Sequence, residues 1–133
     1  EQIRIRLSDT LRWIVSQRLA PKAGGGRYPL LEIMGANLRT QEAIRMGESE
    51  GKTFYEITEA SYPFGWRTFD QVCVEGYEQG LITEETALLY CTKRSVVARG
   101  MDNVKKMRGE MNLTAGSLRM KASGAPPPIL KLK

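Results

Sequence analysis

The stretch from Arg18 to Met34 constrains the fold of this 133-residue chain more than any other, because it places three consecutive glycines between two differently patterned segments. Before the glycines, apolar residues recur at steps of three and four through residues 1–19, which predicts an amphipathic helix. Pro21 cannot continue that helix, and the glycines at 24–26 permit a sharp reversal. Residues 27–34 are then predicted to form a strand.

The predicted strand raises the question of its partner. Pro29 has no backbone N–H, which places the strand at an edge or makes this its first part. Because one strand is not stable alone, we expect its partner to lie outside the printed sequence or in another molecule. The three glycines followed by Arg27 could form an anion-binding nest, but a hairpin-like turn is the interpretation that we favour.

The remaining pattern predicts short helices, so the expected fold class is mainly α with a small β element. Asn37 and Thr83 are predicted N-caps, and residues 53–56 and 68–71 have the pattern of capping boxes. Gly80 is predicted to end the helix that begins near residue 69. The predicted helices cover residues 37–47, 53–61, 68–79, 83–91 and 95–108.

Composition excludes several kinds of chemistry. The chain has no histidine, which removes the commonest general base and metal ligand. Cys73 and Cys91 have no CxxC partner, so we interpret them as core thiols in a reducing compartment and predict no metal site. No apolar run is long enough to cross a membrane. Because the first residue is Glu1, we expect an excised piece or an unresolved start.

The segment Gly47–Thr53 is similar to a phosphate-binding loop but is one residue too short. The spacing in that motif decides which backbone N–H groups converge on the phosphates, and Glu48 and Glu50 would repel them. Thr53 is better explained as a helix cap. We therefore predict no catalytic and no cofactor-binding residues in this chain.

Charge is distributed unevenly along the chain. Residues 93–133 hold 10 Lys and Arg against 2 Asp and Glu, whereas residues 1–92 hold 10 against 13. A solvated helix face followed by a tail is the favoured interpretation of this basic block. The alternative function is a standalone basic helical adaptor that binds an acidic protein, nucleic acid or lipid through residues 94–133. Because no aromatic residues lie among the basic ones, we expect no nucleic-acid partner.

Short motifs in the right order carry a family resemblance. Val15–Leu19, Gly25–Arg27 and Glu32–Met34 are followed by further motifs at Ile44-Arg45, Trp66–Gln71, Gly80–Thr83 and Ala87–Tyr90. Together they resemble the C-terminal part of the PilT-like type IV pilus retraction (twitching motility) ATPases, in the type II/IV secretion ATPase superfamily. The resemblance covers residues 1–92. The gap at 20–26 lacks the four-cysteine zinc module of extension-type relatives, which favours the retraction type.

The resemblance implies a fold and a function. Residues 1–35 would be the C-terminal edge of a RecA-like α/β core, 36–109 a C-terminal helical bundle, and 110–133 a basic, Pro- and Gly-containing, mobile tail. The segment would be a non-catalytic part of a hexameric motor that drives pilus retraction, coupling nucleotide state to subunit movement. ATP and Mg are implied only for the full-length protein. Because the Walker A, Walker B and histidine boxes are missing, we predict that this segment alone does not hydrolyse ATP.

The resemblance also implies sites and partners. A retraction-motif-like helix would contain Ala43, Ile44 and Arg45, and subunit or domain contacts would involve Arg27, Trp66 and Arg67. The implied partners are the protein's own N-terminal and ATPase domains, neighbouring subunits of a homo-hexamer, and the pilus platform of the inner membrane. The implied location is cytoplasmic, peripheral to that membrane. We expect the isolated fragment to self-associate.

Overall fold

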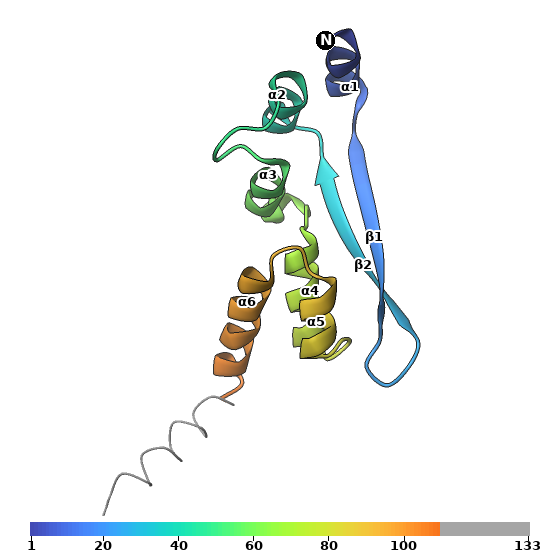
Figure 1. Ribbon diagram of the computed structural model, residues 1–133, viewed down its shortest axis with the longest axis vertical. Helices are drawn as coiled ribbons and strands as arrows, with labels where there is room; N and C mark the ends of the chain where they lie inside the picture. Colours follow the sequence, from blue (N-terminus) through green and yellow to red (C-terminus); the bar gives the residue numbers. More distant parts are fainter. Residues whose placement is uncertain (110–133) are drawn as a thin grey trace, which may run out of the picture. The chain divides into compact units, whose positions relative to one another are not determined.

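A computed structural model describes residues 1–109 of the chain (Figure 1). The chain divides into two compact units after Met101, and the first unit, residues 1–101, contains nearly all of the described secondary structure. The prediction for the tail at 110–133 lies outside the described residues. The elements are α1 (Gln2–Thr10), β1 (Trp13–Pro21), β2 (Arg27–Gly35), α2 (Leu38–Met46), α3 (Phe54–Ala60), the 3-10 helix η1 (Tyr62–Phe64), α4 (Phe69–Glu78), α5 (Glu84–Tyr90) and α6 (Arg94–Met107).

The first helix is much shorter than the sequence pattern predicts. The prediction of a helix over residues 1–19 is wrong beyond Thr10, because residues 13–21 form strand β1. Trp13, Ile14 and Val15 are aromatic or β-branched, which favours a strand where a pairing partner is available. Apolar residues occur on both faces of β1, so their spacing also fits a helical stripe and the period alone does not separate the two structures.

The partner of the predicted strand is β1 itself. The two strands pair antiparallel, from Trp13 opposite Gly35 to Pro21 opposite Arg27. The glycines at 24–26 all have positive φ, between 80° and 110°, and close the connection between the strands. The hairpin-like turn is therefore confirmed. The expectation that the strand's partner lies elsewhere is wrong, because it assigned β1 to a helix.

The hairpin has two different faces, since side chains alternate along a strand. Ala20 and Leu30 point to the inner face and are fully buried. The helices α2–α5 lie on that side of the hairpin (Figure 1). What we call the outer face carries apolar residues that are exposed or half-buried: Trp13, Val15, Leu19, Leu31 and Ile33.

The predicted helix ends are confirmed. The side chains of Asn37, Thr53, Thr68 and Thr83 each accept a hydrogen bond from a backbone N–H in the first turn of the following helix. Gly80, with φ of 72°, follows the end of α4. These local signals need no long-range contact, which is why the sequence predicts them well.

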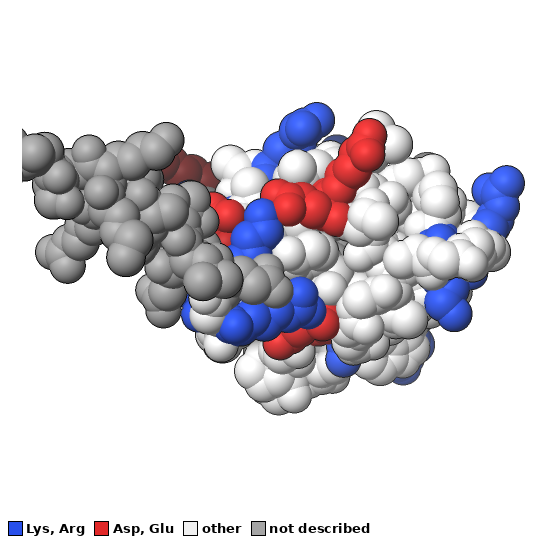
Figure 2. All heavy atoms as spheres, turned by 90° about the horizontal axis from the view of Figure 1, so that it is seen from below, with Lys and Arg blue, Asp and Glu red and all other residues white. Residues whose placement is uncertain are grey.

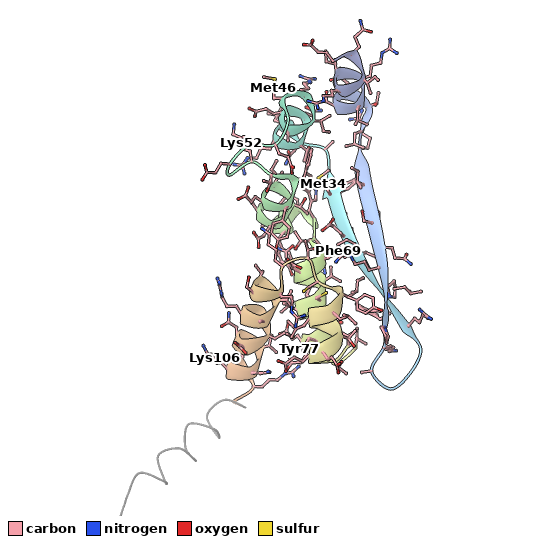
Figure 3. All side chains as sticks on the ribbon, in the orientation of Figure 1. Met34, Met46, Lys52, Phe69, Tyr77 and Lys106 are labelled. Carbon is pink, nitrogen blue, oxygen red and sulfur yellow. The ribbon has the colours of Figure 1, made fainter. Side chains whose placement is uncertain are left out.

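Two apolar clusters hold the first unit together. The larger cluster joins the half of the hairpin nearer the glycine turn to α4, α5 and the start of α6. Its fully buried members are Ala20, Leu30, Cys73, Ala87 and Val97. The smaller joins the end of β2 to α2 and α3 through Met34, Ala43, Ile57 and Trp66. Met34 and Phe69 both point toward the space between the hairpin and the helices, whereas Met46 and Lys52 point away (Figure 3).

Candidate functional site

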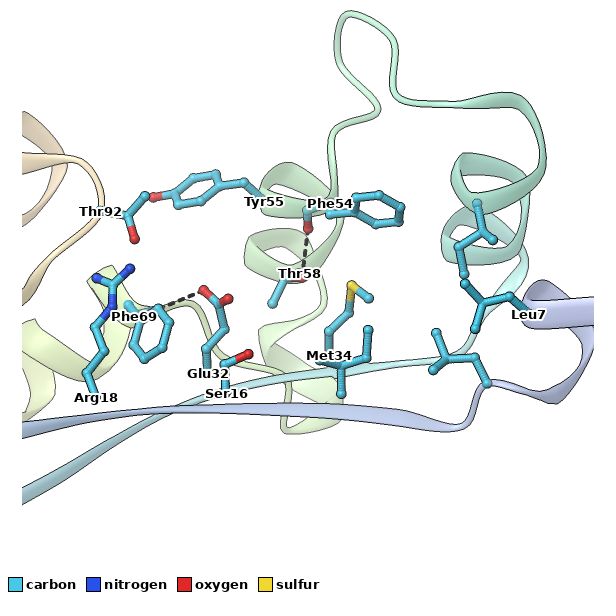
Figure 4. A pocket seen from close by; sticks show the side chains of 13 residues that line it. Leu7, Ser16, Arg18, Glu32, Met34, Phe54, Tyr55, Thr58, Phe69 and Thr92 are labelled. Carbon is cyan, nitrogen blue, oxygen red and sulfur yellow. Dashed lines mark hydrogen bonds between the residues drawn. The ribbon is translucent and has the colours of Figure 1, made fainter. Parts of the chain in front are cut away.

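A cleft of about 580 Å³ lies between the inner face of the hairpin and the helices (Figure 4). It is the best candidate site in residues 1–101 because residues from six helices and strands, and from two connections between elements, converge on it. Its lining residues are Leu7, Leu11, Ile14, Ser16, Arg18, Glu32, Met34, Ile44, Phe54, Tyr55, Thr58, Phe69 and Thr92.

One half of the cleft is apolar. Leu7, Ile14, Met34, Ile44 and Phe54 line it, from α1, the hairpin, α2 and α3. The hydroxyl of Thr58 in this region is already used, because it donates a hydrogen bond to the carbonyl of Phe54 at 2.7 Å. This half can therefore accept apolar groups but offers few hydrogen bonds.

The other half is polar and centres on Phe69. The guanidinium carbon of Arg18 lies 3.8 Å from the centre of the Phe69 ring, and its Nη1 donates to the Tyr90 carbonyl at 2.6 Å. The Glu32 carboxylate accepts a hydrogen bond from the backbone N–H of Phe69 at 3.1 Å. A carboxylate is favoured there because Phe69 is the first residue of α4, where the helix dipole is positive.

Behind this polar half, the buried carboxylate of Asp70 joins three parts of the fold. It accepts hydrogen bonds from the Tyr55 hydroxyl at 2.6 Å, from the Thr92 N–H at 2.6 Å and from the Lys93 N–H at 3.1 Å. The Lys93 ammonium lies 3.7 Å from the Tyr55 ring centre. Burial, and after it the bond to Asp70, raises the pKa of Tyr55. Tyr55 therefore stays protonated and donates to Asp70 at neutral pH.

The retraction-motif-like residues lie on α2 and have three different surroundings. Ala43 is buried in the smaller apolar cluster, and Ile44 lines the cleft. Arg45 reaches α1, where its Nε donates to the hydroxyl of buried Ser8 at 2.7 Å and its guanidinium pairs with Asp9. We call this set of contacts the Arg45 clasp. It fixes α1, and with it the Leu7 end of the cleft, to α2.

The predicted interface residues do not share one surface. Arg27 is exposed at the start of β2. Trp66 is buried, with its ring centre 6.5 Å from that of Trp13 in an edge-to-face arrangement. Arg67 forms an ion pair with Glu75 of α4. Their role in subunit or domain contacts stays a prediction.

The phosphate-loop-like segment is closed on itself. Glu48 accepts a hydrogen bond from the Phe54 N–H at 2.8 Å, which places a carboxylate at the start of α3. Thr53 caps the same helix, and the Lys52 ammonium lies 3.2 Å from Glu42. An adjoining hollow of about 610 Å³ is lined by Glu42, Glu48 and Glu56 and also by Arg39 and Lys52. The carboxylate of Glu48 at the start of α3 opposes phosphate there. Among residues 1–109, no cluster of acidic or cysteine side chains could hold a metal ion.

Sequence reasoning missed the main residues of the polar half. Arg18 was assigned to a helix, and recognising β1 would have placed it on the same face as Glu32, since alternate residues share a face. The sequence analysis does not single out Asp70. Its role depends on Tyr55 and on the 92–93 backbone, which lie 15 and 22 or more residues away in sequence, so no local signal reveals it.

The distribution of charge on the surface does not indicate one class of binding partner. Figure 2 shows one face, on which basic side chains stand beside acidic ones and wide uncharged areas separate them. No helix within residues 1–109 is long and apolar enough to cross a membrane.

Comparisons with known proteins identify relatives of the chain. No protein-family model matches it. The chain is 34% identical over 90 residues to the type IV pilus ATPase PilU of Pseudomonas aeruginosa, a match that covers 67% of this chain and 23% of PilU. It is also 34% identical over 86 residues to the type IV pilus retraction ATPase PilT of that bacterium, covering 64% of this chain and 24% of PilT.

Comparison with solved structures finds proteins of the same kind. A crystal structure of the pilus retraction motor PilT with bound ADP matches with a TM-score of 0.58 and 35% identity, over 74% of this chain and 26% of that one. The Legionella pneumophila ATPase DotB matches over 66% of this chain and 23% of its own, with a TM-score of 0.50 and 19% identity, and supports the fold alone. The chain thus spans about a quarter of the length of these relatives. By sequence and by fold, the chain belongs to the family of PilT-like type IV pilus ATPases.

Proposed function

We propose that this chain is a non-catalytic segment of a type IV pilus retraction motor, in which it couples the nucleotide state to subunit movement. The observation that supports this most is the match to PilT, which has 34% identity in sequence and 35% in the structural superposition. The structural match covers 74% of this chain, so the similarity is not limited to one short motif. In this proposal ATP and Mg belong to the full-length protein.

Two features of the segment's own residues support the proposal that it is non-catalytic. The chain contains no histidine, and its phosphate-loop-like segment presents Glu48 where a phosphate would have to approach the start of α3. We expect no ATP hydrolysis by the purified chain in a phosphate-release assay. Turnover that is lost on Lys52→Ala would contradict this expectation, since Lys52 is the lysine of that segment.

Coupling would act through α2. This helix is buried against the core at Ala43 and is bound to α1 through the Arg45 clasp. Rotation of α1 relative to α2 would strain the contacts of Arg45 with Ser8 and Asp9. The clasp therefore favours joint movement of α1 and α2, which is the property that a transmitting element needs.

The assembly and location follow from the family and are part of the proposal. The segment would contact its own N-terminal and ATPase domains and neighbouring subunits of a homo-hexamer, in the cytoplasm beside the inner-membrane pilus platform. Arg27 is exposed and free to make such a contact, and Trp66 and Arg67 would support the neighbouring backbone from within the segment.

A chimera tests this function. The 86-residue region of Pseudomonas aeruginosa PilT that matches this chain is replaced by the corresponding residues of this chain, and twitching and ATPase activity are measured. We expect both activities to be retained. Arg45→Gln in the chimera should reduce twitching while ATP hydrolysis persists, and Arg39→Gln on the same helix is the matched control. A folded chimera with ATPase activity but no twitching before any substitution would contradict the proposal.

A second candidate is the basic adaptor, which the charge of residues 93–133 favours. Binding of an acidic protein, DNA or anionic vesicles through this block would fall steeply with salt. Binding that is independent of salt, or that survives truncation after Thr92, would exclude this role.

A further inference from the structure

We propose that the cleft binds a small amphiphilic carboxylate, with its apolar chain between the hairpin and helices α2 and α3 and its carboxylate on Arg18. The cleft volume of about 580 Å³ falls in the range of roughly 300–1,000 Å³ that is typical of small-molecule pockets. Its two halves differ in chemistry in the way that such a ligand requires.

The apolar half would hold the chain. Leu7, Ile14, Met34, Ile44 and Phe54 surround it without a charged group among them (Figure 4). Ile14 is 42% exposed although it faces the helices, so part of its apolar surface is open to solvent within residues 1–109. Covering this surface with a hydrocarbon chain is favourable because apolar area leaves water.

The polar half would hold the head group through Arg18. A guanidinium has five N–H donors, and the only hydrogen bond that Arg18 makes within residues 1–109 is to the Tyr90 carbonyl. No carboxylate in that range forms an ion pair with it. Its position is nevertheless fixed, because it stacks on Phe69 at 3.8 Å. A fixed guanidinium with free donors is suited to bidentate binding of a carboxylate.

The cleft lining holds one cationic side chain, Arg18, and one anionic side chain, Glu32, so the head group is selected by which of the two has hydrogen-bonding capacity left. Glu32 and Asp70 are both already bonded to backbone N–H groups, of Phe69 and of Thr92 and Lys93 respectively. Lys93 adds a second positive charge beside Tyr55. A cationic head would meet Arg18 directly, and a neutral alcohol would leave its charge-assisted bonds unmade.

Calorimetric titration of the full chain with decanoate, and with decanol as the neutral analogue, tests the proposal. We expect saturable one-to-one binding of decanoate and binding of decanol that is about tenfold weaker, the loss of one charge-assisted pair. Arg18→Gln should weaken decanoate binding by about tenfold and leave decanol binding unchanged. Arg27→Gln removes the same charge from the hairpin outside the cleft and should have no effect.

A second variant guards against loss of folding in Arg18→Gln, because that change also removes the bond to Tyr90. Ile14→Asp places a carboxylate in the apolar half at a partly exposed position and should abolish binding of both compounds while the circular dichroism spectrum stays that of the unmodified chain. The proposal is overturned if decanoate does not saturate, if decanol binds as tightly as decanoate, or if Arg27→Gln weakens binding as much as Arg18→Gln.

Discussion

At Gly35, the last residue of β2, the structure allows the effect of adding one methyl group on the stability of the fold to be predicted. A Cβ atom there would lie 2.6 Å from Cζ2 of Trp66 and 2.7 Å from its Cε2 and Nε1. Trp66 is only 5% exposed and packs against Met34, Ala43 and Ile57, so the ring cannot move away without disturbing the smaller apolar cluster. We therefore expect Gly35→Ala to destabilise the fold by about 2 kcal/mol through overpacking.

The sign of this effect distinguishes it from the general effect of the substitution. Gly35 does not have a positive φ, so alanine would by itself stabilise the strand, by roughly 0.4–1 kcal/mol, through the unfolded state. Urea unfolding followed by circular dichroism measures the difference, and a loss of about 2 kcal/mol corresponds to a melting temperature roughly 10 °C lower for a unit of this size.

A double-mutant cycle tests the cause. In a Trp66→Leu background the indole atoms that clash with the added Cβ are gone, so Gly35→Ala should then cost less than about 0.5 kcal/mol. If Gly35→Ala is neutral in the unmodified chain, or costs the same in both backgrounds, contact with Trp66 does not limit this position.

Three further predictions concern the polar contacts and the thiols. Asp70→Ala should destabilise the fold by about 3 kcal/mol in urea unfolding, because it leaves buried donors without an acceptor. In the unmodified chain the pKa of Tyr55 is raised above the value of about 10 that it has when unfolded, so the stability that Tyr55 contributes is kept below about pH 10 and lost as the pH rises above it. Arg45→Gln should cost less than about 1 kcal/mol, since its ion pair with Asp9 is half exposed, but should speed hydrogen exchange in α1, and the effect should shrink at high salt. Burial raises the pKa of Cys73 to about 12 and also raises that of Cys91, so at pH 8 both thiols should react slowly with a disulfide reagent, with Cys73 reacting only on unfolding.

Local signals explain which parts of the fold the sequence predicts. The helix caps at Asn37, Thr53, Thr68 and Thr83 depend on residues three positions apart, and all four are confirmed. The first strand depends on pairing across the glycine turn with residues up to 22 positions away, from Trp13 to Gly35. An apolar pattern on both faces hides its period of two, so the period alone does not separate helix from strand there.

The candidate site was less predictable than the fold for the same reason. Ala43, Ile44 and Arg45 were singled out by family resemblance, but their contacts with the core, the cleft and α1 appear only when distant segments meet. The polar half of the cleft joins Arg18 to Tyr90, a separation of 72 residues. No local sequence pattern predicts a contact between residues so far apart in the chain.

The outer face of the hairpin gives the expectation of self-association a new basis. That expectation rested on an unpaired strand, and the strand is paired. The outer face nevertheless exposes Trp13 and Val15 by 60% each and Leu19 by 42%, which is an unusual concentration of apolar residues on a surface.

The edge of β1 supplies the second reason for self-association. Within residues 1–109, β1 pairs only with β2, so its other edge has backbone groups able to pair with a second chain. We expect sedimentation equilibrium to show a dimer whose dissociation constant rises at least tenfold in Val15→Lys, because two copies of the new charge would face each other across a twofold axis. Leu38→Lys adds the same charge at an exposed apolar residue of α2 and should leave the dimer unchanged. A monomer at all measurable concentrations would show that the outer face stays exposed to solvent in the isolated chain. Equal weakening of the dimer by both variants would show that the dimer contact lies elsewhere.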